Sequence, residues 1–141
     1  MTIRDFLFGT GKTSRATDIG LLILRVGIGL PMAFGHGLGK IPPSEGFIGA
    51  TGDMGFPIPI VFAWAAALSE FLGGLLIALG LLTRPAALML AITMAVAAFV
   101  RHAADPFSTK ELALVYLAAS LALLATGAGR YAIDRALRRR D

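Results

Sequence analysis

The chain has 141 residues, of which 56% are hydrophobic and 16% are charged, with a net charge of +4 and a mean hydropathy of +0.75. A soluble domain carries about a quarter of its residues as charged side chains, so this composition excludes a water-soluble globular domain and predicts an integral membrane protein. The absence of cysteine excludes disulfides and thiolate-held clusters, and the surplus positive charge, which lies in arginines beside an apolar segment, indicates lipid headgroups rather than nucleic acid as its counterpart.

Four apolar segments follow a mixed polar and apolar N-terminal segment over residues 1–18. A span needs roughly 20 apolar residues to cross about 30 Å of hydrocarbon, and shorter spans are tolerated where the bilayer thins. The segments that qualify, the last two of them short, are residues 19–39, 58–82, 85–100 and 112–127. We therefore predict an all-α, integral membrane four-helix bundle over residues 19–127, followed by a basic cytoplasmic tail over residues 128–141.

The first connection, residues 41–57, is rich in proline and glycine and also carries several apolar side chains. Such a segment is too apolar to stand free in water. We expect it to lie at the membrane interface or to cap the bundle, with a short amphipathic turn.

Lysine and arginine are divided unevenly between the two sides of the predicted bundle. Nine lie with the two termini and the turn at Arg84, whereas three lie in the other two connections: Lys40, Arg101 and Lys110. The positive-inside rule then places both termini in the cytoplasm, as expected for a multi-pass protein with an even number of spans.

Two charged residues fall inside the predicted spans, Arg25 in the first and Glu70 in the second. A charge in hydrocarbon costs about 2.5 to 3.5 kcal/mol on insertion scales, so each needs a partner or a purpose. Their depths differ by roughly 6 to 8 Å at 1.5 Å per residue, and we predict that they form an ion pair. Two interpretations stay open: a structural link between helices, or a charged floor that binds a polar ligand head or relays protons.

Helical spacing brings further polar residues onto the same faces. The first span has one stripe with spacings of four, three, four and four: Arg25, Gly29, Met32, His36 and Lys40. The second span has a stripe of mostly small residues through the carboxylate: Ala63, Ala66, Glu70, Gly73, Ile77 and Gly80. Small residues allow close approach of helices in membranes, so we expect these two stripes to pack against each other.

The outer ends of the third and fourth spans carry His102 and Glu111. If the face of His102 and the face of Glu111, Val115, Ala118 and Ala122 both point inward, then His36, Lys40, His102 and Glu111 converge at one mouth. His36 and His102 lack the spacing of a helical metal site, so no metal is predicted. Imidazole exchanges protons near neutral pH, which suits proton exchange with a quinone. Met32 and Met94 either line an apolar cavity or serve as plain packing.

These residues, taken in order, resemble the DoxX family over residues 19–124. The resemblance is carried by Arg25 and Gly29, Phe34-Gly35-His36-Gly37, Lys40, Glu70 with residues 71–76, residues 80–87, Met94 and His102. It implies a four-helix, multi-pass protein of the bacterial plasma (inner) membrane. Founding members of the family are described as subunits of quinone-linked oxidoreductases, and others are placed in membrane complexes with redox-defence proteins. It also implies an intramembrane polar cluster of Arg25, His36, Lys40, Glu70 and His102.

The sequence therefore predicts a quinone-interacting or docking subunit of a membrane redox complex, and leaves open whether the chain is catalytic. The alternatives are a non-catalytic scaffold and a unit for small-molecule or proton permeation. The expected cofactor is a quinone, with neither metal nor flavin. The expected partners are the lipid bilayer, proteins of a redox complex and, through the glycine-rich faces of Gly73, Gly74 and Gly80, a second copy of the chain.

Overall fold

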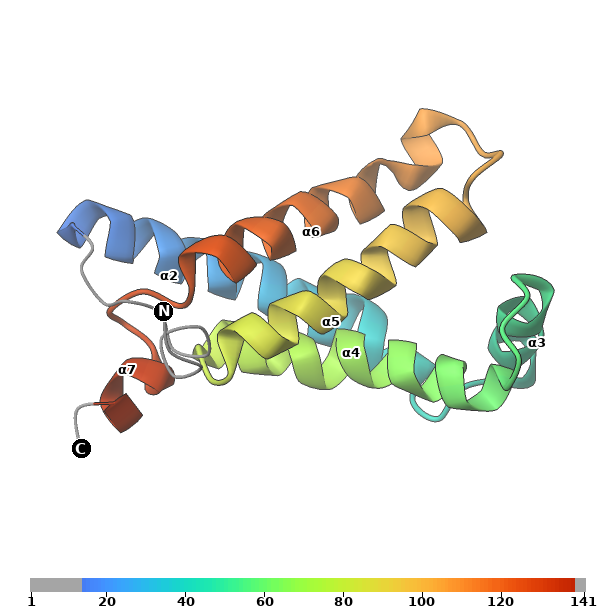
Figure 1. Ribbon diagram of the computed structural model, residues 1–141, viewed down its shortest axis with the longest axis horizontal. Coiled ribbons are helices and arrows are strands. Elements are labelled where there is room, and N and C mark those ends of the chain that lie inside the picture. The colour runs from blue at the N-terminus through green and yellow to red at the C-terminus, as the bar shows by residue number, and fades with distance from the viewer. Residues whose placement is uncertain (1–13, 139–141) are drawn as a thin grey trace.

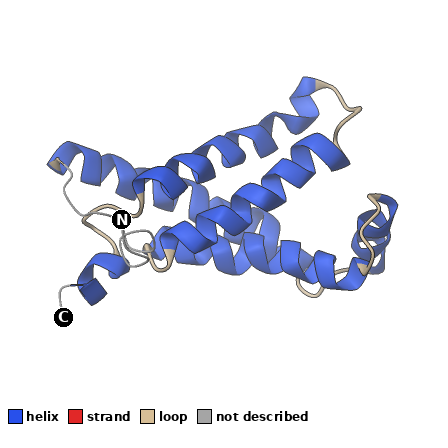
Figure 2. Ribbon diagram, in the orientation of Figure 1, coloured by secondary structure: helices blue, strands red, loops and turns tan. Residues whose placement is uncertain are grey.

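The computed structural model of the chain describes residues 14–138, and every regular element in that range is a helix. Figure 2 shows that loops are confined to short connections. The helices in this range that are long and apolar enough to cross a membrane are Arg15–Lys40, Pro59–Leu79, Thr83–Arg101 and Phe107–Thr126. The predicted all-α fold with four membrane-crossing helices is confirmed. The side of the membrane that each end faces stays a prediction.

The first and third spans each change from α-helix to π-helix along their length. In chain order the elements are α2 (Arg15–Leu30), η1 (Pro31–Gly37), η2 (Leu38–Lys40), α3 (Glu45–Asp53), α4 (Pro59–Leu79), α5 (Thr83–Val96), η3 (Ala97–Arg101), α6 (Phe107–Thr126) and α7 (Ile133–Arg138). The segments η1 and η3 are the π-helices and η2 is a short 3-10 turn. The expected short turn in the first connection is present as α3.

Local sequence explains where several helices begin and end. At the start of α2 the Ser14 hydroxyl accepts the Thr17 N–H at 3.1 Å, and at the start of α3 Ser44 accepts the Phe47 N–H at 3.2 Å. Serine at this position satisfies an N–H group that the helix itself leaves unpaired. Helix α4 ends at Gly80, whose φ of 69° lies in the left-handed region that favours glycine.

Two spans begin at least four residues earlier than the apolar runs indicate. Helix α2 starts at Arg15 and α6 at Phe107, four and five residues before the predicted starts. In α2 the polar first turn is held against the protein because the buried Asp18 carboxylate accepts the Arg130 N–H at 2.8 Å. In α6 the helix continues into polar residues because its backbone hydrogen bonds do not depend on side-chain hydropathy.

The bundle has two ends of different construction (Figure 1). Helix α7, the start of α2 and the α4–α5 turn lie at one end, which we call the terminal end. Helix α3 and the α5–α6 connection lie at the other, which we call the loop end. Towards the loop end the α5–α6 hairpin diverges from α4 and from α3. The candidate site lies in this diverging half.

Helices α2 and α4 cross at glycine. A Cβ atom on Gly29 would lie 2.5 Å from the Gly74 carbonyl oxygen, and one on Gly74 would lie 2.7 Å from the Gly29 oxygen. The predicted packing between the two stripes is confirmed in part. Lys40 contacts Glu70 and Arg25 contacts the Ile77 carbonyl, but the backbone contact of α4 at this crossing is at Gly74, outside the predicted stripe. However, Gly73, Gly74 and Gly80 are buried inside the chain. They therefore do not form the surface for a second copy that the sequence suggested, because the chain's own helices occupy it.

The core lies between all four spans, around the buried residues Leu21, Met32, Ile77, Ala86, Ala87, Leu90, Met94, Tyr116 and Leu123. The condition under which Glu111 would join the polar cluster, an inward-facing Glu111 side of α6, is not met. Glu111, Val115, Ala118 and Ala122 are all exposed, and the face that packs inward contains Tyr116, Ser120 and Leu123. Helix α6 is apolar on nearly every side, so its sequence does not reveal which side is buried.

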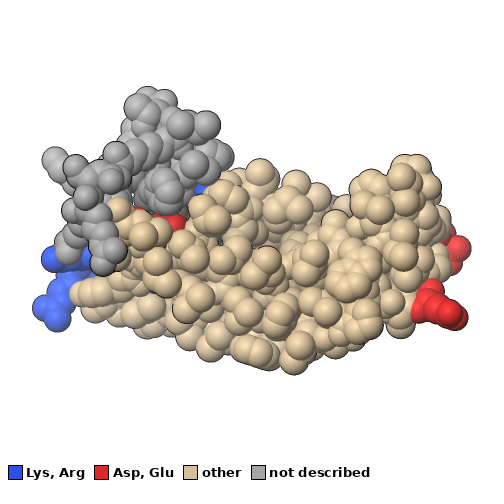
Figure 3. Space-filling model, turned by 90° about the horizontal axis from the view of Figure 1, so that it is seen from below, with Lys and Arg blue, Asp and Glu red and all other residues tan. Residues whose placement is uncertain are grey.

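Charged side chains gather at the two ends on the face drawn in Figure 3. Basic atoms appear at the terminal end and acidic atoms at the loop end, where α3 carries the exposed residues Glu45 and Asp53. Between them lies a broad band of uncharged residues. Apolar side chains are highly exposed on the spans, with Ile23 at 67% and Phe99 at 62%. This distribution suits contact with lipid around the bundle.

Candidate functional site

The partner of Glu70 is Lys40. The Lys40 Nζ atom donates to both carboxylate oxygens of Glu70, at 2.7 Å to Oε1 and 2.5 Å to Oε2. The Glu70 side chain is 4% exposed and that of Lys40 is 34% exposed. The cation also lies over the ring of Phe47, 5.5 Å from its centroid. One side chain thus links η2 to α4 and to α3 at the loop end.

The predicted Arg25–Glu70 ion pair is therefore wrong, and the crossing of α2 and α4 explains why. Gly37 packs against the backbone of Glu70 and Phe71, whereas Gly29 packs against Gly74 and Ala78. Position 70 is thus level with position 37 of the first span. Arg25 lies twelve residues before that level, or roughly 18 Å at 1.5 Å per residue, which is too far for its side chain to reach Glu70.

Arg25 instead caps the end of α4. Its guanidinium donates to the Ala78 carbonyl at 3.2 Å and to the Tyr131 carbonyl at 2.5 Å. Carbonyls in the last turn of a helix have no partner within the helix and carry the negative end of its dipole, so a cation there is stabilising. Arg25 is fully buried, and its contacts assign it a structural role at the terminal end, remote from Glu70.

Two buried acids at the terminal end were missed by the sequence analysis. Asp134, in α7, accepts the N–H groups of Leu82 at 2.8 Å and Thr83 at 3.1 Å, at the start of α5. Asp18 holds the backbone of Arg130, as described above. Neither had a sequence signal, because Asp134 lies in the predicted tail and Asp18 outside the first apolar run. Residues 130–134 are consequently held against the bundle.

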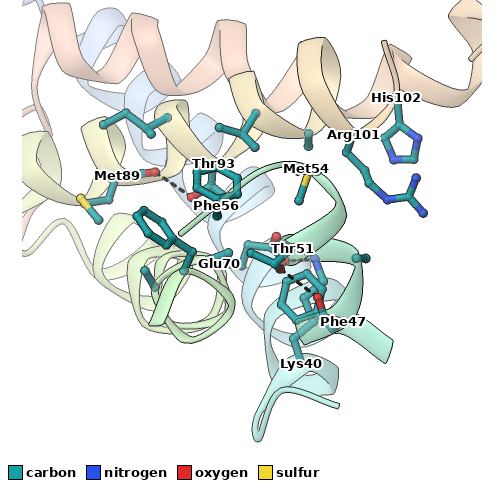
Figure 4. A pocket seen from close by; sticks show the side chains of 17 residues that line it. Lys40, Phe47, Thr51, Met54, Phe56, Glu70, Met89, Thr93, Arg101 and His102 are labelled. Carbon is teal, nitrogen blue, oxygen red and sulfur yellow. Dashed lines mark hydrogen bonds and ion pairs between the residues drawn. The ribbon is translucent and has the colours of Figure 1, made fainter. Parts of the chain in front are cut away.

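Two cavities border the Glu70 side chain, and the larger of them lies between α3, α4 and α5 at the loop end, with a volume of about 460 Å³. Figure 4 shows the side chains that line it. Its walls are mostly apolar, and the polar residues among them are Lys40, Thr51, Glu70, Thr93, Arg101 and His102. Thr93 donates to the Met89 carbonyl at 3.0 Å, and Thr51 donates to the Phe47 carbonyl at 2.8 Å. The cavity therefore combines an apolar interior with a small number of polar groups near Glu70.

The smaller cavity, of about 160 Å³, lies on the other side of Glu70, between η1, α5 and α6. The residues that line only this cavity are Met32, His36, Met94, Thr109, Leu112, Ala113 and Tyr116, and those shared with the larger cavity are Lys40, Glu70, Ala97 and His102. The His36 and Tyr116 rings meet edge to face with centroids 5.9 Å apart. Tyr116 was also missed, although a tyrosine inside an apolar helix was the available signal.

The structure thus brings together six of the eight residues singled out from the sequence. His36, Lys40, Glu70, His102, Met32 and Met94 all line the smaller cavity. Arg25 lies at the opposite end, and Glu111 is exposed and lines neither cavity. His102 is oriented by Asp105, whose carboxylate lies 2.6 Å from its Nδ1 atom. Within residues 14–138 no group of three or more His, Cys, Asp or Glu side chains is arranged to hold a metal ion.

Comparisons with known proteins place these features in a family context. The model of the DoxX family matches residues 20–103. The chain is 34% identical over 122 residues to "Putative oxidoreductase CatD" of Bacillus subtilis (strain 168), covering 86% of this chain and 89% of that protein. It is 36% identical over 131 residues to "Inner membrane protein YqjF" of Escherichia coli (strain K12), covering 87% and 95%. No solved structure gives a significant match.

Proposed function

Because the chain belongs to the DoxX family of bacterial multi-pass membrane proteins, we propose that it is a quinone-binding subunit of an inner-membrane redox complex. The larger cavity is the proposed binding site. The observation that carries this proposal is a mostly apolar cavity of about 460 Å³ with one histidine and one ion pair, between the buried Glu70 and the partly exposed Lys40, at its polar side. The volume falls within the roughly 300 to 1,000 Å³ typical of small-molecule sites.

The chemistry of the walls suits a quinone head. A quinone ring is flat and apolar, and its two carbonyl oxygens accept hydrogen bonds. Phe47, Phe56 and Phe62 offer aromatic surface to such a ring. The Lys40 ammonium and the His102 imidazole are the donors for a carbonyl oxygen. Glu70 holds Lys40 in place through both carboxylate oxygens.

The surroundings of the larger cavity suit a ligand that arrives from the bilayer. Phe62, Met89 and Ile92 line it and are also exposed on the outside of α4 and α5. These side chains belong to the apolar surface of the spans, so the walls of the cavity continue into the lipid-facing surface. A long isoprenoid tail would remain in lipid while the head occupies the cavity.

The name of the Bacillus relative supports a redox setting, and the fold supports a subunit rather than a complete enzyme. The described chain offers a binding site and proton-exchanging groups, and electron transfer would come from a partner protein. The terminal end suits docking of a protein of such a complex, because Arg25 holds the Tyr131 carbonyl and Asp134 holds α7 on the bundle, and Arg130 is exposed beside them. A purely non-catalytic scaffold would use the same surface without the cavity.

The test compares two identical substitutions at different places. Ala66 lines the larger cavity, whereas Ala118 faces outward on α6. Ala66→Leu should fill part of the cavity and weaken quinone binding by about tenfold or more, equivalent to ~1.4 kcal/mol. Ala118→Leu should leave it unchanged. Binding is measured by mass spectrometry of co-purified quinone and by quenching of the single tryptophan, Trp64, with a short-tailed quinone.

The outcomes separate the interpretations. A wild-type protein that neither retains nor binds quinone would refute the proposal and leave the scaffold interpretation in place. Equal losses in both variants would mean that binding depends on general packing of the bundle rather than on the larger cavity.

A further inference from the structure

The two cavities share one wall but have different surroundings. Lys40, Glu70 and His102 border both. The larger cavity is continuous with the lipid-facing surface of α4 and α5, as described above. The smaller cavity reaches exposed Thr109 in the first turn of α6, at the loop end. Exposed Glu111 lies in the next turn, which indicates that this level of the protein meets water or headgroups.

The interior of the smaller cavity is suited to water. A buried water needs two to four polar partners, and a volume of about 160 Å³ has room for several molecules. His36 and the Tyr116 hydroxyl provide partners on one side, and the Glu70 carboxylate and Lys40 ammonium provide them on the other. Met32 and Met94 complete the wall.

The backbone geometry around the smaller cavity also indicates a functional site. The two π-helices of residues 14–138, η1 and η3, both contribute to the smaller cavity. Met32 and His36 belong to η1, and Ala97 begins η3. Single π-turns inside α-helices often occur at functional sites, because the extra residue in the turn displaces side chains and alters backbone hydrogen bonding.

We propose that the smaller cavity is a water-filled vestibule that connects the Glu70 carboxylate to the aqueous phase at the loop end. Glu70 is the group through which the two cavities communicate. When a ligand hydroxyl in the larger cavity gives its proton to a Glu70 oxygen, the ligand oxygen keeps the electron pair, and the carboxyl group then releases that proton to a vestibule water. The ligand in this step rests on the proposed function, whereas water access to the vestibule is independent of it.

Thiol accessibility tests the vestibule directly, because the chain has no cysteine of its own. Ala113 lines only the smaller cavity and Thr93 only the larger one. Single variants Ala113→Cys and Thr93→Cys are prepared in liposomes and treated with a charged methanethiosulfonate reagent. Ser44→Cys, at an exposed position, and Ala87→Cys, in the core, set the upper and lower limits of reactivity.

The expected result is a difference between the two cavities. Only the thiolate reacts, and burial in apolar surroundings suppresses it. Ala113→Cys should therefore react at least about a hundredfold faster than Ala87→Cys. Thr93→Cys should react with the charged reagent as slowly as Ala87→Cys, but readily with an uncharged, lipid-soluble maleimide. A decyl-tailed quinone should protect Thr93→Cys and leave Ala113→Cys unprotected.

Each alternative outcome has a separate meaning. If Ala113→Cys elutes as a folded protein yet reacts no faster than Ala87→Cys, the vestibule is wrong. If quinone protects Ala113→Cys as well as Thr93→Cys, the two cavities act as one site and the inference is again overturned. If quinone protects neither while Ala113→Cys reacts quickly, the quinone proposal fails and the vestibule stands.

Discussion

The side chains of Lys40 and Glu70 form the ion pair on which the candidate site depends. Glu70 is almost completely buried, whereas about a third of the Lys40 side chain remains exposed. The two partners therefore differ in what happens when the other is removed. A buried carboxylate left without its cation retains the full penalty of desolvation, while the lysine ammonium can extend towards water.

This asymmetry predicts the order of stability in three variants. Lys40→Met should lower the stability of the protein by about 2 to 3 kcal/mol, and Glu70→Gln by about 1 kcal/mol. The double variant Lys40→Met/Glu70→Gln should be more stable than Lys40→Met alone, because no unpaired charge remains. Apparent melting temperatures in mild detergent provide the measurement. A double variant that loses the sum of both single effects would contradict the coupling.

At the scale of elements, the crossing of α2 and α4 determines which residues of the two helices are level. The two backbones touch at Gly29 and Gly74, where no side chain fits between them. This contact sets the axial offset that places Lys40, and not Arg25, beside Glu70. The π-helix η1 begins immediately after the crossing and brings His36 to the smaller cavity.

The glycine contact predicts opposite effects for the same substitution at two positions of α2. Gly29→Ala would place its Cβ atom 2.5 Å from a backbone oxygen, and the forced separation should cost about 1 to 3 kcal/mol. Gly27→Ala meets nothing within 4 Å and should be neutral or stabilising by up to about 1 kcal/mol through helix propensity. Detergent melting curves of both variants distinguish the two effects. Equal destabilisation would show that the contact is not close-packed.

At the scale of the whole molecule, exposed charges differ between the two ends, and this difference bears on the orientation of the protein in the membrane. The exposed basic residues Arg15 and Arg130 lie at the terminal end, and the exposed acidic residues of α3 lie at the loop end. Cytoplasmic loops of membrane proteins carry an excess of lysine and arginine. We therefore expect the terminal end in the cytoplasm and both cavities in the outer half of the membrane.

Labelling of intact spheroplasts tests this orientation. A membrane-impermeant maleimide should modify Ser44→Cys, at the loop end, and should leave Ala136→Cys, which is exposed on α7, unmodified until the cells are lysed. Modification of Ala136→Cys in intact cells, with Ser44→Cys protected, would reverse the orientation.

The sequence by itself determined the class of the protein, the number of spans and four of the five residues of the predicted polar cluster, which are His36, Lys40, Glu70 and His102. Apolar runs long enough for a bilayer are a local property, and the helical period of 3.6 places residues on a common face without reference to other helices. The face of Arg25, Met32, His36 and Lys40 could therefore be identified. The burial of Glu70 likewise follows from the cost of a lipid-facing charge.

Only the tertiary structure determined which side chains pair with each other and which helix faces point inward. The axial offset of α2 and α4 depends on where two glycines meet. Nothing in the sequence therefore indicated that Lys40, and not Arg25, pairs with Glu70. The inward face of α6, with Tyr116, depends on its packing against α5, because a helix that is apolar on every side has no preferred orientation of its own. The two cavities arise where the α5–α6 hairpin diverges from α3 and α4, a feature of the assembled bundle rather than of any single helix.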